Sequence, residues 1–366
     1  MRWPSRRFLL TLAGLALLVL VLDRLRGLMQ LKDFSGYRLL ESVRGARWEY
    51  LLLSVAAIYV CYALRALRWQ RLSRYLGTCH FGSVYQMTLA GFASIFLLGR
   101  AGEPVRPLLI ARREKLPVSG MLGIYLLERL MDPASVALLA VLALAFFSAG
   151  GRHTRLQEIE KYRKAIRVVL IIGVAVASAV VAYFRVYGGR QAGALLEKWR
   201  ARGGGWARFA GAVEGLLHGF RSIRTVGDLL AAAGYSAAHW LLVALIYLWV
   251  PMSLGGRLAT IRFTGAMLVL AITMLGSMAL LPGVGGGPQT AAIIAFTTIF
   301  GVQQEPAAAA SILLWLVTFA ACTLVGVPIL IREGWSMGEL LRLAEQKEAG
   351  AGQASLKGGS PGGSPE

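Results

Sequence analysis

The chain has 366 residues, of which 56% are hydrophobic and only 16% are charged, and its mean hydropathy is +0.59. A soluble domain carries about 25% charged residues, so the composition excludes an ordinary soluble fold. The 39 lysines and arginines exceed the 19 acidic residues and give a net charge of +20. Beside long apolar runs, this excess indicates an anionic membrane surface rather than nucleic acid.

Nine apolar segments follow one another along the chain. The first comes after a cluster of arginines and is followed by Asp23 rather than by a cleavage site, so we predict a retained anchor. Each segment is predicted to be a helix, because a bilayer leaves every backbone polar group dependent on an internal partner. The segments lie at about 8–22, 49–64, 82–98, 119–147, 166–184, 228–250, 264–281, 287–301 and 307–331.

The distribution of positive charge favours one of two topologies. If every segment except 287–301 spans the membrane, lysines and arginines divide evenly between the two faces. If 82–98 and 264–301 instead dip in and return, most of them lie on the side of the N-terminus, in agreement with the positive-inside rule. We therefore predict an all-α polytopic membrane protein with about six spanning helices and two re-entrant broken-helix hairpins. Both termini would be cytoplasmic, and the membrane would be the bacterial inner membrane.

An internal similarity supports this topology. After a one-residue gap, GRAGEP at 99–104 aligns with GVGGGP at 283–288, and short apolar runs follow at 107–111 and 291–295. In the second topology the two units enter from opposite faces, which is the inverted repeat with broken helices of many transporters. The alternative is a chance similarity between two glycine-proline turns.

Three groups of residues are the main candidates for a substrate site. In the first glycine turn, Arg100 and Arg106 could hold phosphate oxygens and Glu103 could hold one of these arginines in place. The alternative is a cytoplasmic loop with solvated charges. In segment 119–147, Glu128 and Asp132 form an i,i+4 pair and Arg129 and Asp132 an i,i+3 pair. Ions in such a segment should face the protein interior or a wet cavity. The alternative is a self-neutralising cluster that locks helices together.

The second glycine turn is the third candidate. Its glycines could line a cavity, and the helix that follows could present free N–H groups to an anionic headgroup. The alternative is a flexible connector between two short helices. The residues concerned are Gly283, Gly285, Gly286 and Gln289.

Secondary candidates are Arg65, Arg68 and His239. The arginines follow an apolar segment and are interpreted as part of a cytoplasmic anchor for anionic lipid, with a specific role open for Arg65. For His239 we favour a buried neutral imidazole with one hydrogen bond over a proton relay. No HExxH pair, CxxC pair, nucleotide-binding P-loop or GxSxG elbow occurs. We therefore expect no metal and no cofactor.

We assign residues 1–335 to one transmembrane domain. Its stretch 185–227 is basic and is expected in the cytoplasm, and 206–224 has the pattern of an amphipathic helix in the interface plane. Residues 336–366 are a cytoplasmic tail that is rich in Gly, Ser and Pro and is predicted to be disordered from about 348.

These motifs together resemble the membrane region of lysylphosphatidylglycerol synthases, the flippase-like or UPF0104 family. The resemblance rests on Arg65 to Trp69, Gly99 to Arg106, Glu128 to Asp132 and Pro282 to Gly286, and covers roughly 5–335. It implies a polytopic bacterial membrane protein that moves a lipid between leaflets. Family members with a cytosolic acyltransferase domain flip aminoacylated phosphatidylglycerol. This chain ends soon after its last helix, so that synthase activity is not expected. Gln289 stands where the family usually has a glutamate.

We expect a lipid flippase-like transporter that moves an anionic or lipid-linked headgroup, and we expect no enzymatic activity. Its partners would be a membrane phospholipid or lipid-linked substrate and anionic lipids at the cytoplasmic face. One alternative is a non-transporting membrane scaffold of a lipid-synthesis complex, whose enzymes would then be partners. The other is a membrane-embedded lipid-carrier transferase with Glu128 or Asp132 as its base.

Overall fold

The computed structural model describes residues 41–146 except 42, residues 168 and 172, residues 191–214 except 205, 208 and 212, and residues 225–334 except 278–279 and 282–284. The predicted anchor at 8–22, nearly all of segment 166–184, the second half of the predicted amphipathic helix at 206–224 and the tail 336–366 lie outside these residues.

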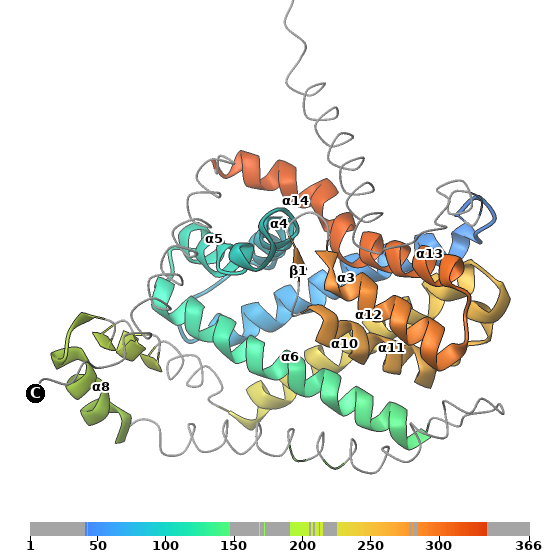
Figure 1. Cartoon of the computed structure of the whole chain (residues 1–366). Coiled ribbons are helices and arrows are strands. Elements are labelled where there is room, and N and C mark those ends of the chain that lie inside the picture. The colour runs from blue at the N-terminus through green and yellow to red at the C-terminus, as the bar shows by residue number, and fades with distance from the viewer. Residues whose placement is uncertain are drawn as a thin grey trace, which may run out of the picture.

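The described chain is helical apart from one short antiparallel pair of strands (Figure 1). Within it, four helices are long and apolar enough to cross a membrane. They are α3 (Trp48–Ser73), α4 (Phe81–Leu98), α10 (Val226–Ser253) and the continuous stretch Gln304–Arg332. A further long helix, α6 (Val118–Phe146), carries the ions at 128, 129 and 132. The structure therefore confirms a helical membrane protein with several apolar helices.

The described chain contains two hairpins, each made of two helices joined by a turn. In the first, α4 ends in the turn η1 (Gly99–Gly102), and α5 (Val105–Arg113) packs back along α4. In the second, α11 (Phe263–Gly276) is followed by strands β1 (Leu280–Leu281) and β2 (Gly285–Gly286), and α12 (Gly287–Ile294) packs back along α11. Segment 82–98, which was predicted to dip in and return, is instead one unbroken helix, and the second arm of its hairpin is α5. Segment 264–301 contains both arms of its hairpin.

Glycines allow the close approach of these hairpin arms. A Cβ atom on Gly91 of α4 would lie 2.3 Å from Cβ of Arg106 in α5, and one on Gly276 would lie 2.4 Å from the carbonyl oxygen of Gly287. Non-bonded carbon atoms normally stay about 3.5–4.0 Å apart, so each hairpin closes only because glycine has no side chain at that point.

The stretch 304–332 contains α13 (Gln304–Trp315), the π-helical turn η5 (Leu316–Ala320) and α14 (Ala321–Arg332). A second π-helical turn, η4 (Ala295–Ile299), extends α12. Between α10 and α11 lies the short 3-10 helix η2 (Gly256–Thr260). The predicted segment 307–331 is therefore helical throughout, with one wider turn near its middle.

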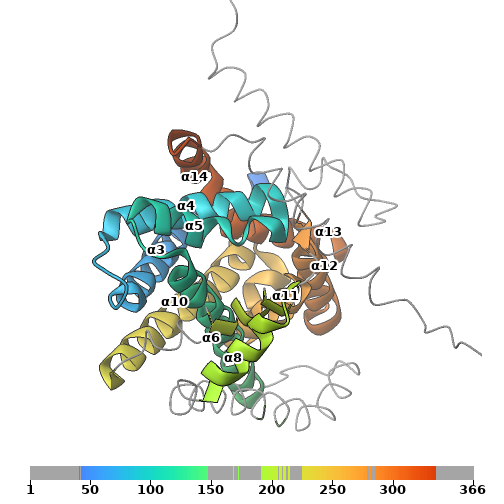
Figure 2. The ribbon, with the colours of Figure 1, turned by 90° about the vertical axis from the view of Figure 1, so that its left-hand side faces the viewer.

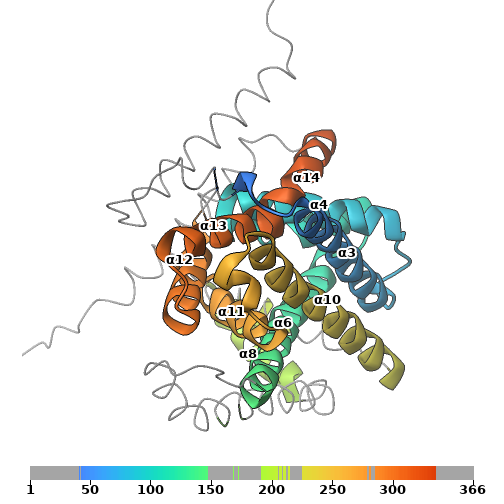
Figure 3. The same ribbon diagram turned by 90° about the vertical axis from the view of Figure 1, so that its right-hand side faces the viewer.

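Three pairs of the described helices pack along one another. α3 lies along α10, which Figures 2 and 3 show from opposite sides. α4 packs along α14, where a Cβ atom on Gly326 would lie 2.4 Å from the carbonyl oxygen of Leu89, and α11 packs along α6. α10 begins with a capping box, in which the Thr225 hydroxyl accepts from the amide of Asp228 and the Asp228 carboxylate accepts from the amide of Thr225.

The basic segment 185–227 is described in part. It contains α8 (Gln191–Ala201). Gly203 and Gly204 separate α8 from the described part of the predicted amphipathic helix at 206–224. The rings of Trp199, Trp206 and Phe209 lie 5.3–6.2 Å apart. Trp206 and Phe209, from the predicted apolar face, are about half exposed. The placement of this face in a membrane interface stays a prediction.

Candidate functional site

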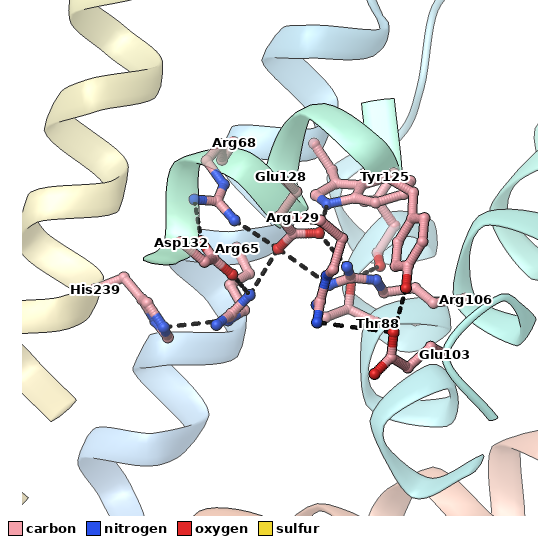
Figure 4. Close-up of polar contacts among 12 residues, drawn as sticks. Arg65, Arg68, Thr88, Glu103, Arg106, Tyr125, Glu128, Arg129, Asp132 and His239 are labelled. Carbon is pink, nitrogen blue, oxygen red and sulfur yellow. Dashed lines mark hydrogen bonds and ion pairs between the residues drawn. The ribbon is translucent and has the colours of Figure 1, made fainter. Parts of the chain in front are cut away.

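A buried carboxylate, Glu128 of α6, is the centre of the candidate site (Figure 4). Its Oε1 accepts from Arg65 Nη1 at 2.6 Å and from Arg68 Nη2, and its Oε2 accepts from Trp69 Nε1 at 2.8 Å and from Arg106 Nη2. Glu128 is fully buried, and Arg68 and Arg106 have side chains that are 1% exposed. One carboxylate therefore serves three guanidinium groups from α3 and α5.

A second carboxylate, Asp132, lies one turn further along α6. Its Oδ2 accepts from Arg65 Nη1 at 2.8 Å and its Oδ1 from Arg68 Nη1 at 2.9 Å. Arg68 Nη1 also donates to Ser236 Oγ of α10 at 2.7 Å. We call Arg65, Arg68, Arg106, Glu128 and Asp132 the ion cluster. It joins α3, α5 and α6, and through Ser236 it reaches α10.

Helix geometry explains why these side chains meet. Residues three and four apart lie on one face of a helix, so Arg65, Arg68 and Trp69 share the buried face of α3, as Glu128 and Asp132 share that of α6. Arg106 stands in the first turn of α5 and comes within reach because Gly91 gives α5 room against α4.

His239 of α10 lies at the other end of the ion cluster. Its Nε2 accepts from Arg65 Nε at 3.1 Å, and the residue is 4% exposed. A ring nitrogen that accepts a hydrogen bond carries no proton, so the imidazole is neutral and its proton is on Nδ1. The structure confirms that His239 is buried and hydrogen-bonded, as predicted. The structure records no partner for its Nδ1 among the described residues.

Aromatic rings line the ion cluster. The guanidinium of Arg106 lies 4.6 Å from the Trp69 ring, and those of Arg65 and Arg106 each lie 5.2 Å from the Phe92 ring. Arg65 also lies 5.7 Å from the Trp240 ring. Cation–π contacts of desolvated arginines contribute about 2 kcal/mol each, so the rings offset part of the cost of burying these charges.

A looser group borders the ion cluster. Glu103, which follows η1, accepts from the Tyr125 hydroxyl, and its Oε2 lies 3.9 Å from Arg129 Nη1. The Arg129 guanidinium lies 5.1 Å from the Tyr125 ring. The side chains of Arg129 and Glu103 are 36% and 21% exposed. We call Glu103, Arg106, Tyr125 and Arg129 the rim site, and Arg106 belongs to both groups (Figure 4).

The structure corrects three sequence-based interpretations. Arg65 and Arg68 are not a surface anchor for lipid, because both are buried among carboxylates of another helix. Asp132 is paired with these two arginines and not with Arg129 of its own helix. Glu103 does not hold Arg106, which contacts Glu128 instead, and Oε2 of Glu103 lies 3.9 Å from Arg129 Nη1. The counter-charges of Glu128 and Asp132 come from α3 and α5, so the alternative of a self-neutralising cluster that locks helices together stays open beside that of a substrate site.

The remaining candidates lie elsewhere. The backbone of Arg100 is in η1, but its side chain is outside the described atoms, as is all of Gly283. Gly285 and Gly286 form β2, and Gln289 in the first turns of α12 is 1% exposed, with its carbonyl oxygen accepting from Ser311 Oγ at 3.0 Å. The second glycine turn thus precedes a short, partly buried helix, and its contact with an anionic headgroup stays a prediction.

Two further side chains belong to the site but were not among the predicted site residues, although Trp69 lies in a stretch that carries the family resemblance. Trp69 donates to Glu128 and stacks on Arg106, and Tyr125 holds Glu103. Their positions in the sequence indicate that they lie near the ion cluster, because Trp69 follows Arg68 on the buried face of α3. Tyr125 precedes Glu128 by three residues and Arg129 by four.

The chemistry open to this arrangement follows from its hydrogen bonds. Every oxygen of Glu128 and Asp132 accepts from an arginine, so neither carboxylate is placed as a free base. Across the described residues, no group of three or more His, Cys, Asp or Glu side chains could hold a metal ion. The partly exposed side chain of Arg129 is instead suited to contact an anion.

Comparisons with known proteins show the family of the chain. The family model described as the lysylphosphatidylglycerol synthase TM region matches residues 8–326. A protein of Methanothermobacter thermautotrophicus named UPF0104 membrane protein is 24% identical over 323 residues, which cover 82% of this chain and 90% of that protein.

Proposed function

Because the chain belongs to the family of the lysylphosphatidylglycerol synthase transmembrane region, we propose that it is a flippase-like transporter that moves an anionic or lipid-linked headgroup between membrane leaflets. The observation that carries the proposal is the ion cluster. Charged side chains are expensive inside an apolar helical bundle and usually mark a substrate pathway. Here five of them are buried together, with the rim site open beside them.

The rim site provides the first contact with the headgroup. Arg129 is the most exposed guanidinium of the group and has only a long contact with Glu103. Phosphate oxygens would be held by Arg129 and Arg106, while the acyl chains stay in lipid beside exposed apolar side chains such as Leu52, Leu230 and Leu324. The ion cluster behind keeps Arg106 in position through Glu128.

The proposal assigns transport rather than a chemical reaction to this site. A lipid-carrier transferase would need Glu128 or Asp132 to take a proton. Both carboxylates already accept from two or three guanidinium groups, so neither has an oxygen free to take a proton from a substrate. The same pairs support a role in positioning the arginines.

We also propose that the helices form an inverted repeat, with α3–α6 as one unit and α10–α14 as the other. In this repeat α3 corresponds to α10, α4 to α11 and α6 to α14. The contact between α4 and α14 then corresponds to the contact between α11 and α6, and the contact between α3 and α10 corresponds to itself, which supports the assignment. Each unit has one long helix, one glycine-closed hairpin and one further long helix. Such repeats place the substrate site near their interface.

The accompanying proposals concern location and partners. We propose a multi-pass protein of the bacterial inner membrane with both termini in the cytoplasm, residues 1–335 forming its transmembrane domain. Its substrate would be a membrane phospholipid or lipid-linked compound. Anionic lipids would also contact the basic segment 185–227.

The test is leaflet exchange in reconstituted vesicles. A fluorescent anionic phospholipid is placed in both leaflets, and a membrane-impermeant reductant reports the fraction that becomes accessible with time. The Arg129→Gln variant is compared with Arg113→Gln, which removes an arginine from an exposed pair with Glu333. We expect exchange to be lost in the first and retained in the second. Equal exchange in the parent, Arg129→Gln and protein-free vesicles would refute transport and favour the scaffold alternative.

A further inference from the structure

The rim site has hydrogen-bond donors without acceptors. Nε of Arg106 and Nε of Arg129 are both buried, and neither has a partner among the described residues. Arg129 Nη1 lies 3.9 Å from Glu103 Oε2, which is beyond hydrogen-bond distance. Arg106 is 1% exposed, so water is not the obvious partner of its Nε. Donors of this kind call for an oxygen-rich ligand, since leaving a buried donor unpaired is costly.

The charges point the same way. Among the described side chains of the ion cluster and the rim site, four arginines face three carboxylates, and His239 is neutral. The assembly therefore carries one positive charge that no described side chain neutralises. The oxygens of Glu128 and Asp132 are already occupied, so the site offers little to a positively charged group.

We propose that the rim site binds a group with a single negative charge spread over oxygen atoms, of the phosphate-diester type, and that Glu103 competes with this group for Arg129. The inference rests on the proposed function and narrows its substrate class. A monoanion makes the assembly neutral. A dianionic phosphate monoester leaves an excess negative charge, a zwitterionic headgroup leaves the positive charge in place, and a lysyl ester of phosphatidylglycerol adds to it.

The expected selectivity follows from Coulomb's law. One unbalanced charge about 6 Å away at an effective dielectric constant of about 20 changes binding by roughly a hundredfold, and we expect at least about tenfold at this partly exposed site. The order of affinity should be monoanion first, then dianion and zwitterion, with the net-positive lipid last.

The first measurement is titration calorimetry of the full chain in phosphatidylcholine nanodiscs. The probes are short-chain phosphatidylglycerol, phosphatidic acid, phosphatidylcholine and lysyl-phosphatidylglycerol, at a pH of about 7. At this pH a phosphate monoester carries about 1.5 to 2 negative charges, and the α-amino group of the lysyl ester is largely protonated. Dimethyl phosphate is the soluble source of the same chemistry. We expect short-chain phosphatidylglycerol to bind most tightly. Binding of dimethyl phosphate with equal affinity would support the charge class but would remove the lipid as ligand, and with it the proposed function.

Charge variants provide the decisive test. Glu103→Gln raises the net charge of the assembly to two and should shift the preference by about tenfold toward phosphatidic acid. Arg129→Gln brings the net charge to zero and should remove the preference for an anion. The double variant returns it to one and should again prefer the monoanion, although with weaker binding. Arg113→Gln combined with Glu333→Gln removes an exposed pair and is the matched control.

Two results would overturn the inference. One is an unchanged order of affinities in Glu103→Gln, and the other is a double variant whose preference follows Arg129→Gln instead of returning to the monoanion. The vesicle assay separates this failure from that of the proposed function. Exchange of all four lipids at equal rates, abolished by Arg129→Gln, would leave transport standing and refute only the charge class.

Discussion

The substitution Gly91→Ala tests how the ion cluster is assembled. The new Cβ atom would lie 2.3 Å from Cβ and 2.9 Å from Cα of Arg106. Carbon atoms in contact lie about 3.5–4.0 Å apart, so α5 must move away from α4 by about 1 Å or more. This movement carries Arg106 away from Glu128, which is the carboxylate it contacts. We therefore expect both stability and transport to fall.

Two opposing effects set the size of the change in the free energy of unfolding. Overpacking a core costs about 1–3 kcal/mol, and replacing glycine by alanine inside a helix returns about 1 kcal/mol. Gly82→Ala on the same helix is the matched control, because nothing lies within 4 Å of its new Cβ atom. That variant should be stabilised by about 0.5–1 kcal/mol. The same chemical change on α4 should thus have opposite signs at the two positions.

The assay is thermal unfolding of both variants in detergent, followed by intrinsic fluorescence, together with lipid exchange in vesicles. For a domain of this size 1 kcal/mol shifts Tm by about 2–4 °C, so the two variants should differ by several degrees. Gly82→Ala should exchange lipid at the parental rate. If Gly91→Ala unfolds at or above the parental temperature and exchanges lipid normally, the packing of α5 on α4 does not position Arg106 and our reasoning is wrong.

Three further substitutions probe the ion cluster and its supports. Glu128→Gln removes the shared counter-charge and should lower the free energy of unfolding by about 3–5 kcal/mol. Adding Arg106→Gln should restore part of this loss. A Glu128→Gln variant as stable as the parent would contradict the pairing. Trp69→Phe removes the indole donor to Glu128 but keeps a ring beneath Arg106, so denaturant unfolding should reveal a loss of about 1.5–3 kcal/mol, and no loss would mean that the bond is not formed. Thr225→Ala breaks the capping box with Asp228 and should cost about 0.5–2 kcal/mol; faster amide exchange confined to the first turn of α10 checks it, and unchanged exchange would speak against the cap.

Much of the ion cluster could be predicted from the sequence. Glu128 and Asp132 stand one helical turn apart in an apolar segment, and buried charges need partners, so arginines had to be near them. Arg106 follows a glycine turn and was a natural candidate. The helix positions followed from the apolar runs, since the observed α4 and α6 begin and end within a residue of the predicted segments.

The partners of Asp132 could not be predicted. Arg65 and Arg68 come after an apolar run, and at that place a surface anchor and a buried pair have the same local pattern. What decides between them is that α3 continues to Ser73 and lies against α6, which is a tertiary fact. Arg129 was paired with Asp132 because residues three apart share one face of a helix, but Asp132 is paired with Arg65 and Arg68 of α3, and Arg129 lies near Glu103 instead.

The ion cluster also constrains how the sequence can diverge. A single replacement at Glu128 leaves three arginines without a shared partner, at a cost of about 3–5 kcal/mol out of a typical total stability of about 5–15 kcal/mol. Few lineages can pass through such an intermediate, so the five positions should change together or hardly at all. Within the family, Arg65, Arg68, Arg106, Glu128 and Asp132 should behave as one inherited unit, and relatives that lack one arginine should also lack an acid. A survey of many relatives in which these positions vary independently would contradict that expectation.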